Sequence, residues 1–293
     1  MIYAIGDIHG QHVMLKALLA KLTSLPLRSD DTVIFLGDYV DRGENSRAVI
    51  EMLLEWREER PGTIFLRGNH EQLMLDVQDS PADTDPIERA RIALSWLRHG
   101  GGEALLSYSA PGIRPWLDVT GDEASTPSSA AVAELASLVD RWIGLIPDSH
   151  WEFLRSTQME HLTSRYHFVH AGLLSPGQKW ESLRPGIDPR LWIREPFLSN
   201  IASFDGRLVV FGHTPQQNRR PLIQRNKICL DTGAVFGGPL VAGIFNTRAG
   251  TPVKLHGVIE VPFARSLSAL FKPIPVDKSR IRKRRSSTGA STK

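Results

Sequence analysis

Asp7 and His9 are the first residues of this chain whose types and spacing could bind a metal. They stand two residues apart between Gly6 and Gly10, and these glycines let the backbone bend so that a carboxylate and an imidazole can point at one spot. An oxygen and a nitrogen ligand together suit a borderline divalent metal such as manganese, iron or zinc. Such a pair in a turn can equally be hydrogen-bonded to neighbouring backbone, so this segment alone does not establish a metal site.

A second segment, from Gly37 to Gly43, has the same character. Its Asp38 carboxylate could bridge two cations, while Asp41 and Arg42 project onto the same rim. The competing interpretation is a surface turn with an Asp–Arg salt bridge, which contributes little to stability.

A third segment places Asn69, His70 and Glu71 directly after Gly68. Asn69 could supply a neutral carbonyl ligand, and His70 could face the opening of a site. Asn and Glu are also ordinary capping residues at the start of a helix, which is the alternative here.

Two later histidines, His170 and His213, also stand beside glycine after an apolar run. Each of the five segments has an ordinary structural explanation when taken singly. Five separate turns with metal-capable or proton-transferring side chains are hard to explain as structure alone, so together they predict a catalytic metal site.

The elements that must position these residues are short apolar runs that alternate with helix-like segments in the first third of the chain. Strands are expected at 2–5, 32–36 and 63–66, and helices at 13–25 and 46–60. This alternation predicts a mainly parallel sheet with functional loops at the carboxyl ends of its strands. Each motif follows such a run.

The rest of the chain divides into three parts. Residues 70–162 have helical character, including 131–146, and we expect an insertion over about 80–162 that caps one side of the sheet. Strand patterns return at 166–169, 207–211, 227–230, 240–245 and 253–261, and their close spacing suggests a second, more antiparallel layer. Residues 1–272 are then one catalytic domain, and 273–293 form a basic Ser/Thr-rich tail that we expect to be disordered.

The ordered motifs GDIHG, GDYVDRG, GNHE, HAG and GH resemble those of the phosphoprotein phosphatase branch of the calcineurin-like metallophosphoesterases, especially small bacterial and phage members. The resemblance covers about residues 1–255. It implies an α/β (α+β) fold in four layers, a two-sheet β-sandwich flanked by helices, with the central helical segment as a cap insertion.

The resemblance also implies a role for each site residue. Asp7, His9 and Asp38 would hold one metal ion, and Asp38, Asn69, His170 and His213 would hold the other. His70 would donate a proton, Asp41 would orient it and Arg42 would bind phosphate. Arg194 best matches a second phosphate-binding arginine, with Arg190 close enough to leave both open. No role is expected for Asp231 or for the remaining histidines: His12, His99, His150, His161, His167 and His256.

This site predicts a phosphoester hydrolase with two divalent metal ions, manganese first and iron or zinc as alternatives. Metals that lower the pKa of bound water allow hydroxide to attack phosphorus near neutral pH, with His70 as the general acid. The preferred function is a serine/threonine-type protein phosphatase, acting on a phosphorylated protein or a small phosphoester. The alternative is a symmetrical dinucleoside tetraphosphatase or another nucleotide phosphohydrolase; a non-catalytic binding protein is disfavoured because every expected ligand is present.

Composition bears on where the protein acts and on its partners. The chain has 293 residues, one cysteine (Cys229) and a net charge of +3. Seven basic residues fall in the last sixteen positions, so subtracting them leaves about −4 for the body, which gives no sign of a nucleic-acid-binding domain. Only the tail could contact nucleic acid or acidic lipid. With no secretory signal and no membrane-spanning run, we expect a cytoplasmic protein without a membrane partner.

Overall fold

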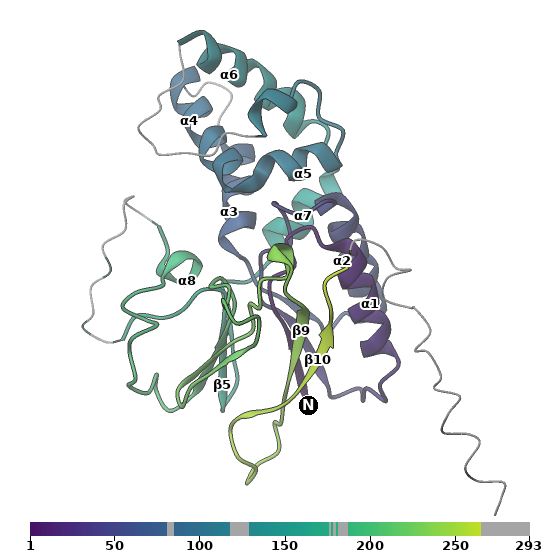
Figure 1. Ribbon diagram of the computed structural model, residues 1–293, viewed down its shortest axis with the longest axis vertical. Coiled ribbons are helices and arrows are strands. Elements are labelled where there is room, and N and C mark those ends of the chain that lie inside the picture. The colour runs from purple at the N-terminus through teal and green to yellow at the C-terminus, as the bar shows by residue number, and fades with distance from the viewer. Residues whose placement is uncertain (81–84, 118–128, 176, 178–179, 181–186, 265–293) are drawn as a thin grey trace, which may run out of the picture.

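The computed structural model describes residues 1–80, 85–117, 129–175, 177, 180 and 187–264 (Figure 1). The predicted strands and helices of the first third are present with boundaries shifted by one or two residues, a normal uncertainty at element ends. The helices are α1 (His12–Thr23), α2 (Ser46–Glu59), α3 (Asn69–Asp79), α4 (Pro86–Trp96), the π-helical turn η1 (Leu97–Gly101), α5 (Gly102–Ser107), η2 (Arg114–Trp116), α6 (Ser129–Ile143), α7 (Asp148–Ser156), α8 (Pro189–Trp192) and η3 (Ala234–Phe236).

The first sheet has the strand order β10-β9-β1-β2-β3. Its members are β1 (Ile2–Ile5), β2 (Thr32–Phe35), β3 (Ile64–Phe65), β9 (Leu240–Phe245) and β10 (Leu255–Val261). β1, β2 and β3 pair in parallel, as the alternating strand and helix pattern predicts, while β9 and β10 add antiparallel. The carboxyl ends of β1, β2 and β3 therefore meet at one edge.

The second sheet has the order β4-β5-β6-β8-β7, from β4 (Glu160–Leu162), β5 (Tyr166–Val169), β6 (Leu208–Phe211), β7 (Leu222–Ile223) and β8 (Lys227–Cys229). β5, β6 and β8 are parallel, and only β4 and β7 pair antiparallel. The prediction of a second, more antiparallel layer was wrong, because each sheet has two parallel and two antiparallel pairings. Parallel pairing needs long crossovers, which the segments after β5 and β6 supply, and two of the strands assigned to that layer are β9 and β10 of the first sheet.

The two sheets pack face to face, which confirms the predicted two-sheet arrangement flanked by helices. An apolar cluster between them joins Ala4 and Ile34 of the first sheet to Phe168 and Val210 of the second. Residues of α1 and α2 pack on the outer face of the first sheet, and Ile193, Phe197 and Phe204 from the segment after α8 pack on the outer face of the second. Each sheet is thus covered on both faces, as parallel strands require.

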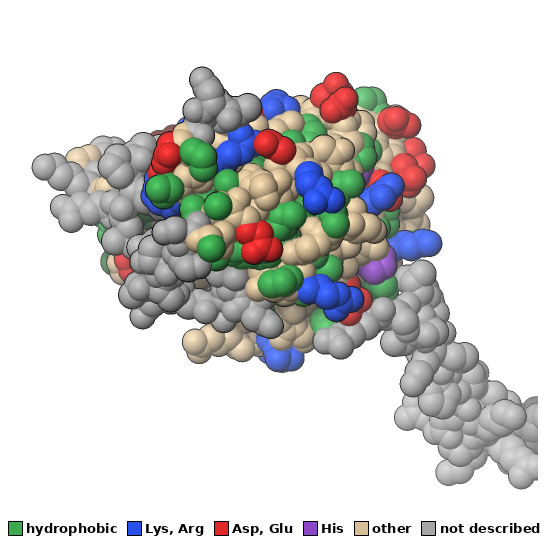
Figure 2. Space-filling view, turned by 90° about the horizontal axis from the view of Figure 1, so that it is seen from above, with side chains coloured by type: hydrophobic (Ala, Val, Ile, Leu, Met, Phe, Trp, Pro, Cys, Tyr) green, Lys and Arg blue, Asp and Glu red, His purple; other side chains and the backbone are tan. Residues whose placement is uncertain are grey.

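Helices α4, α5 and α6 form a separate group above the sheets (Figure 1). They lie within the predicted insertion of about 80–162, and the expected helix at 131–146 is α6, which starts and ends slightly earlier. Seen from this end, acidic, basic and hydrophobic side chains are interspersed rather than separated by type (Figure 2). The predicted tail at 273–293 lies outside the described residues. Among the described helices, none is long and apolar enough to cross a membrane.

Candidate metal and phosphate site

The site forms where the predicted motifs follow their strands. Asp7 and His9 follow β1, Asp38 follows β2, His170 follows β5 and His213 follows β6. β1 and β2 run parallel, as do β5 and β6, so the loops in each sheet emerge at one edge. Packing of the two sheets brings these edges together, and residues up to 206 positions apart in the sequence become neighbours.

Asp38 lies at the centre of the site and is 2% exposed. Its Oδ2 is 3.3 Å from Nε2 of His9, and its Oδ1 is 3.3 Å from Nε2 of His170. Two groups of potential metal ligands share this carboxylate, His9–Asp38–His70 and Asp38–His170–His213, with ligand atoms within 4.8 Å of one another in each. A carboxylate shared by two groups is suited to bridging two cations.

Hydrogen bonds fix the rings of His9 and His170 in the orientation that a metal ligand needs. Nδ1 of His9 donates to the carbonyl oxygen of Val40 at 2.9 Å, and Nδ1 of His170 donates to that of Leu36 at 2.8 Å. A carbonyl oxygen only accepts, so each Nδ1 carries a hydrogen, and each Nε2 lies 3.3 Å from an oxygen of Asp38. Backbone carbonyls orient metal-binding histidines in this way.

Asn69, His213 and Asp7 complete the set around Asp38. Oδ1 of Asn69 is 2.9 Å from Nδ1 of His213 and 3.1 Å from Nε2 of His170. Both carboxylate oxygens of Asp7 accept from the backbone N–H of His213, at 3.1 and 2.9 Å. Nε2 of His213 is buried and has no hydrogen-bond partner. An orphaned buried imidazole nitrogen is costly unless it binds something, so these residues fit a metal ion.

The site also concentrates buried negative charge. Burial raises the pKa of Asp7 well above its usual range, and Asp231 and Asp38 raise it further. Burial likewise raises the pKa of Asp231 to about 6, although the N–H of Gly233 opposes the shift by donating to its Oδ1 at 2.9 Å. Bound cations would relieve this repulsion. Asp231, to which sequence analysis gave no role, thus contributes charge to the site.

His70 and Asp41 form a buried pair beside Asp38. Nδ1 of His70 lies 2.8 Å from Oδ2 of Asp41, and the two side chains are 1% and 0% exposed. Burial lowers the pKa of His70 well below its usual range, while the charge of Asp38 opposes the shift. Burial also raises the pKa of Asp41, opposed by a hydrogen bond from Trp96. Additional negative charge in the site, such as a phosphate dianion, would raise the pKa of His70 again.

Arg42 and Arg194 both reach this region. Nη1 of Arg42 is 3.1 Å from Nε2 of His9, and Nη2 of Arg194 donates to the carbonyl oxygen of His213 at 3.3 Å. Arg190, the alternative left open by the sequence, instead pairs with Asp188 and Glu160 through bonds of 2.7 and 2.9 Å. The structure therefore places Arg194, and not Arg190, with the metal-capable residues.

The backbone of the site departs from ordinary geometry. Non-glycine residues adopt positive φ at His9 (44°), Asp38 (54°), Asp41 (72°), Arg42 (64°) and His213 (64°). Side chains rarely occupy this region, and such conformations persist only where the surroundings impose them. Their concentration in the predicted motifs indicates that the loops are shaped to aim side chains.

Glycines make room for the carboxylates. A Cβ atom on Gly68 would lie 2.1 Å from Oδ1 of Asp38, and one on Gly212 would lie 2.1 Å from Oδ1 of Asp7. Real Cβ atoms do not approach oxygen so closely, so glycine is required for steric reasons at both positions.

Sequence analysis missed three supporting residues. Glu71, considered only as a cap, accepts from the backbone N–H groups of Asp38 at 2.8 Å and Tyr39 at 2.7 Å, and so holds the turn that carries Asp38. Trp96 donates to Asp41, and the ring of His99 lies 6.1 Å from that of His70. Nothing in the local pattern of the cap marks Trp96 or His99, whereas a glutamate at the start of a helix after Gly68 is a detectable signal for Glu71.

Two of the other histidines set aside at the sequence level have partners of their own. His150 is hydrogen-bonded to Tyr108 at 2.8 Å, and His167 pairs with Glu160 at 2.6 Å. Trp192 is closer to the site, since its ring lies 6.2 Å from that of His213 and 5.3 Å from that of His99.

Two packed sheets with Asp, Asn and His side chains converging at the strand ends define the class of metallophosphoesterases. The chain belongs to the calcineurin-like phosphoesterase family, whose model matches residues 1–241. It is therefore a member of a family of phosphoester hydrolases.

Individual relatives carry two different names. The chain is 27% identical over 241 residues to serine/threonine-protein phosphatase 1 of Salmonella typhimurium, which covers 82% of this chain and 89% of that protein. It is 28% identical over 293 residues to the symmetrical bis(5'-nucleosyl)-tetraphosphatase of Acidovorax ebreus, which covers 90% and 98%. A solved metallophosphoesterase from Sphaerobacter thermophilus is 17% identical over 90% of this chain and 88% of that one, with a TM-score of 0.47.

Proposed function

We propose that this chain is a metal-dependent phosphomonoesterase of the serine/threonine protein phosphatase type, which acts on a phosphorylated protein or a small phosphoester. The observation that carries the proposal is the buried Asp41–His70 pair with its 2.8 Å contact beside Asp38. When a phosphate ester of serine or threonine is cleaved, the side-chain oxygen leaves as an alkoxide, a strong base that needs a proton during bond cleavage. A leaving nucleotide phosphate is a much weaker base and needs no such donor.

The metal-binding roles that we propose are those implied by the family resemblance. Asp7, His9 and Asp38 would hold one divalent ion, and Asp38, Asn69, His170 and His213 would hold the other. Bound divalent ions supply Lewis-acid activation of water and neutralise phosphate charge. Mixed oxygen and imidazole donors suit manganese, iron or zinc, and we propose manganese as the ion that supports activity in vitro.

The remaining residues bind the phosphoryl group and move a proton. Arg42 and Arg194 can each present a planar pair of N–H donors to phosphoryl oxygens. His70 holds a proton on Nδ1 against Asp41, and its Nε2, 3.9 Å from Oδ2 of Asp38, is directed into the site. A bound phosphate dianion raises the pKa of His70 and so favours a second proton, at Nε2, for delivery to the leaving oxygen.

A second candidate, a symmetrical dinucleoside tetraphosphatase, has its own support. Several of the curated relatives have this name, and the match to the Acidovorax ebreus protein spans nearly its whole length. Phe236 is 57% exposed, and the Arg42 guanidinium lies 5.8 Å from the centre of its ring. An exposed aromatic ring beside a phosphate-binding arginine could stack a nucleobase.

Steady-state kinetics on two substrates separate the candidates. Purified protein loaded with manganese is assayed with a phosphoserine peptide and with diadenosine tetraphosphate, and elemental analysis of the same sample gives the metal content. We expect two ions per chain and a higher kcat/KM for the peptide. A higher kcat/KM for the dinucleotide, with ADP as the product, would establish the second candidate instead. Protein without bound metal and without activity on either substrate would refute both.

A further inference from the structure

The Asp41 carboxylate has a second side-chain partner besides His70, and it comes from the cap. The indole Nε1 of Trp96 lies 3.0 Å from Oδ1 and 3.1 Å from Oδ2 of Asp41, across 55 positions of sequence. An indole N–H can only donate, so the carboxylate accepts from Trp96 on one side and faces Nδ1 of His70 on the other. The backbone N–H of Asp41 is bound to Oγ of Ser46 at 2.9 Å, which fixes the residue from a third direction.

Trp96 is held tightly in its place. It is the last residue of α4, is 2% exposed and is followed directly by the π-helical turn η1. A Cβ atom on Gly101 would lie 2.6 Å from the Trp96 ring, so only glycine permits this packing. Within this turn Gly100 has a φ of 100° and a ψ of 17°, outside helical geometry, so the chain kinks shortly after Trp96.

The adjoining residues of the same turn also contact the site. The carbonyl oxygen of Gly100 accepts from the backbone N–H of Arg42 at 3.0 Å, and a Cβ atom on Gly100 would lie 2.6 Å from Cγ of Arg42. His99 packs edge-on against His70, and its own Nδ1 is fixed 2.6 Å from the carbonyl oxygen of Ser95. One turn of the cap therefore touches Asp41, Arg42 and His70.

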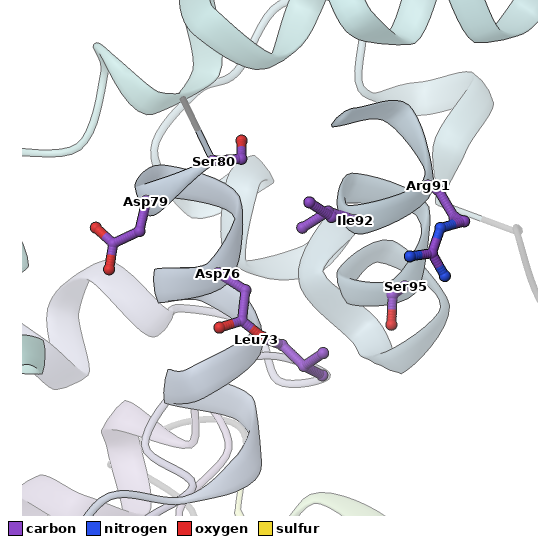
Figure 3. A pocket seen from close by; sticks show the side chains of 7 residues that line it. All are labelled: Leu73, Asp76, Asp79, Ser80, Arg91, Ile92 and Ser95. Atoms are coloured by element: carbon purple, nitrogen blue, oxygen red, sulfur yellow. The ribbon is translucent and has the colours of Figure 1, made fainter. Parts of the chain in front are cut away.

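Other residues of α4 line a cavity instead. Ile92 and Ser95 line a cavity of about 400 Å³ with Leu73 and Asp76 of α3 (Figure 3). None of the described residues that line this cavity is a metal-capable or proton-transferring residue of the site. The end of α4, rather than this cavity, is the part of the cap that concerns the reaction.

We propose that Trp96 is a positioning residue for protonation of the leaving group, whose indole N–H holds the Asp41 carboxylate in line with Nδ1 of His70. This inference rests on the proposed phosphomonoesterase function and deepens it. The cap then contributes to the part of the catalytic site that protonates the leaving group. Removing the indole N–H leaves Asp41 with one side-chain donor, free to rotate away from His70, and removes a bond to a buried carboxylate.

The test compares two substrates that differ in their need for a proton. Trp96→Phe removes the N–H and keeps a large buried ring, and the matched control is Trp142→Phe in α6, whose Nε1 donates to the carbonyl oxygen of Pro111 at 2.9 Å. Each variant is assayed with a phosphoserine peptide, whose leaving group is a serine alkoxide, and with para-nitrophenyl phosphate, whose leaving group is a stabilised phenolate. Metal content and Tm are measured alongside.

General acids typically contribute about 100- to 10,000-fold, so loss of one orienting bond should lower kcat for the peptide by about 10- to 100-fold. The expected change for para-nitrophenyl phosphate is less than about 3-fold, because its leaving group needs little protonation. Trp142→Phe should not alter the ratio of the two rates. In an Asp41→Asn background, Trp96→Phe should cause no further loss, since its effect passes through Asp41.

Equal losses on both substrates, an unchanged peptide rate, or full additivity with Asp41→Asn would overturn the role of Trp96 while the wild type still hydrolyses phosphomonoesters. A wild type that hydrolyses no phosphomonoester would instead refute the proposed function, and this inference with it. Should Trp96→Phe not fold, replacement of Trp96 by benzothienylalanine removes the N–H with almost no change in shape and gives the same readout.

Discussion

The strand-end loops and the helical cap are stabilised by opposite kinds of interaction. The loops hold buried carboxylates and imidazoles, and their backbone adopts positive φ at residues such as Asp38 and Asp41. The cap depends on apolar packing of α4 against α6, where Leu135, Val139 and Trp142 are almost fully buried. Size-conserving changes should therefore be tolerated in the cap and damaging in the loops, and Trp96 is where the two regions meet.

The largest effect is expected at the centre of the loops. Asp38→Asn keeps the volume of the side chain but removes the charge shared by His9 and His170, each 3.3 Å away. Because both proposed metal positions depend on this carboxylate, kcat/KM should fall by roughly three orders of magnitude or more. Elemental analysis of the purified variant should find fewer than two ions per chain. Retention of both ions would contradict the assignment of Asp38 as the shared ligand.

A single methyl group tests how tightly the loops are packed. In Gly68→Ala the new Cβ would lie 2.1 Å from Oδ1 and 2.4 Å from the backbone nitrogen of Asp38. The carboxylate must shift, so we expect about a 10- to 100-fold loss of kcat/KM and about 1 to 3 kcal/mol of lost stability. In the control Gly62→Ala no atom lies within 4 Å of the new Cβ. If the two variants behave alike in activity and in chemical denaturation, the loops are more adaptable than their geometry indicates.

Glu71→Gln removes the charge of a residue that holds the backbone of Asp38 and is not itself a proposed metal ligand. Oε2 of Glu71 accepts from the N–H groups of Asp38 and Gly68, each at 2.8 Å, and Oε1 accepts from Tyr39 at 2.7 Å. A glutamine amide would turn its own N–H groups toward backbone donors on one side, at a cost of about 1 to 3 kcal/mol. Urea denaturation should show this loss, while exposed Glu55→Gln on α2 stays near the wild type. A stability equal to that of the Glu55 variant would show that this carboxylate is not needed to hold the turn.

The same contrast explains what could be predicted from the sequence. The loop residues follow recognisable strands and lie beside glycines, so their convergence follows from parallel pairing. Arg194 and Arg190 could not be separated, because the choice depends on which side chain Asp188 and Glu160 bind. The contact of Trp96 with Asp41 was not predictable, since a buried tryptophan at the end of an amphipathic helix has the same pattern whether it fills a core or donates to a carboxylate. The strand pairing in the second sheet could not be predicted either, because it depends on the paths of the long loops that connect its strands.

The smallest effect is expected inside the cap, at the buried ionisable side chain of His150. His150 in α7 is 3% exposed, its Nδ1 lies 2.8 Å from the hydroxyl oxygen of Tyr108, and burial lowers its pKa. As pH falls below about 6.5, the unfolded chain takes up a proton on this residue that the folded chain resists. The stabilising contribution of the neutral ring is therefore present above that pH and is lost as pH falls toward the lowered folded pKa.

His150→Gln removes this proton uptake and should flatten the pH dependence of stability. Between pH 7.5 and pH 5.5 we expect the wild type to lose about 1 kcal/mol more stability than the variant, measured as the difference in their Tm shifts. Exposed His256→Gln is the control and should follow the wild type. Identical slopes for wild type and His150→Gln would mean that the cap opens enough to hydrate His150, and the contrast between a polar loop region and a dry cap would then have to be abandoned.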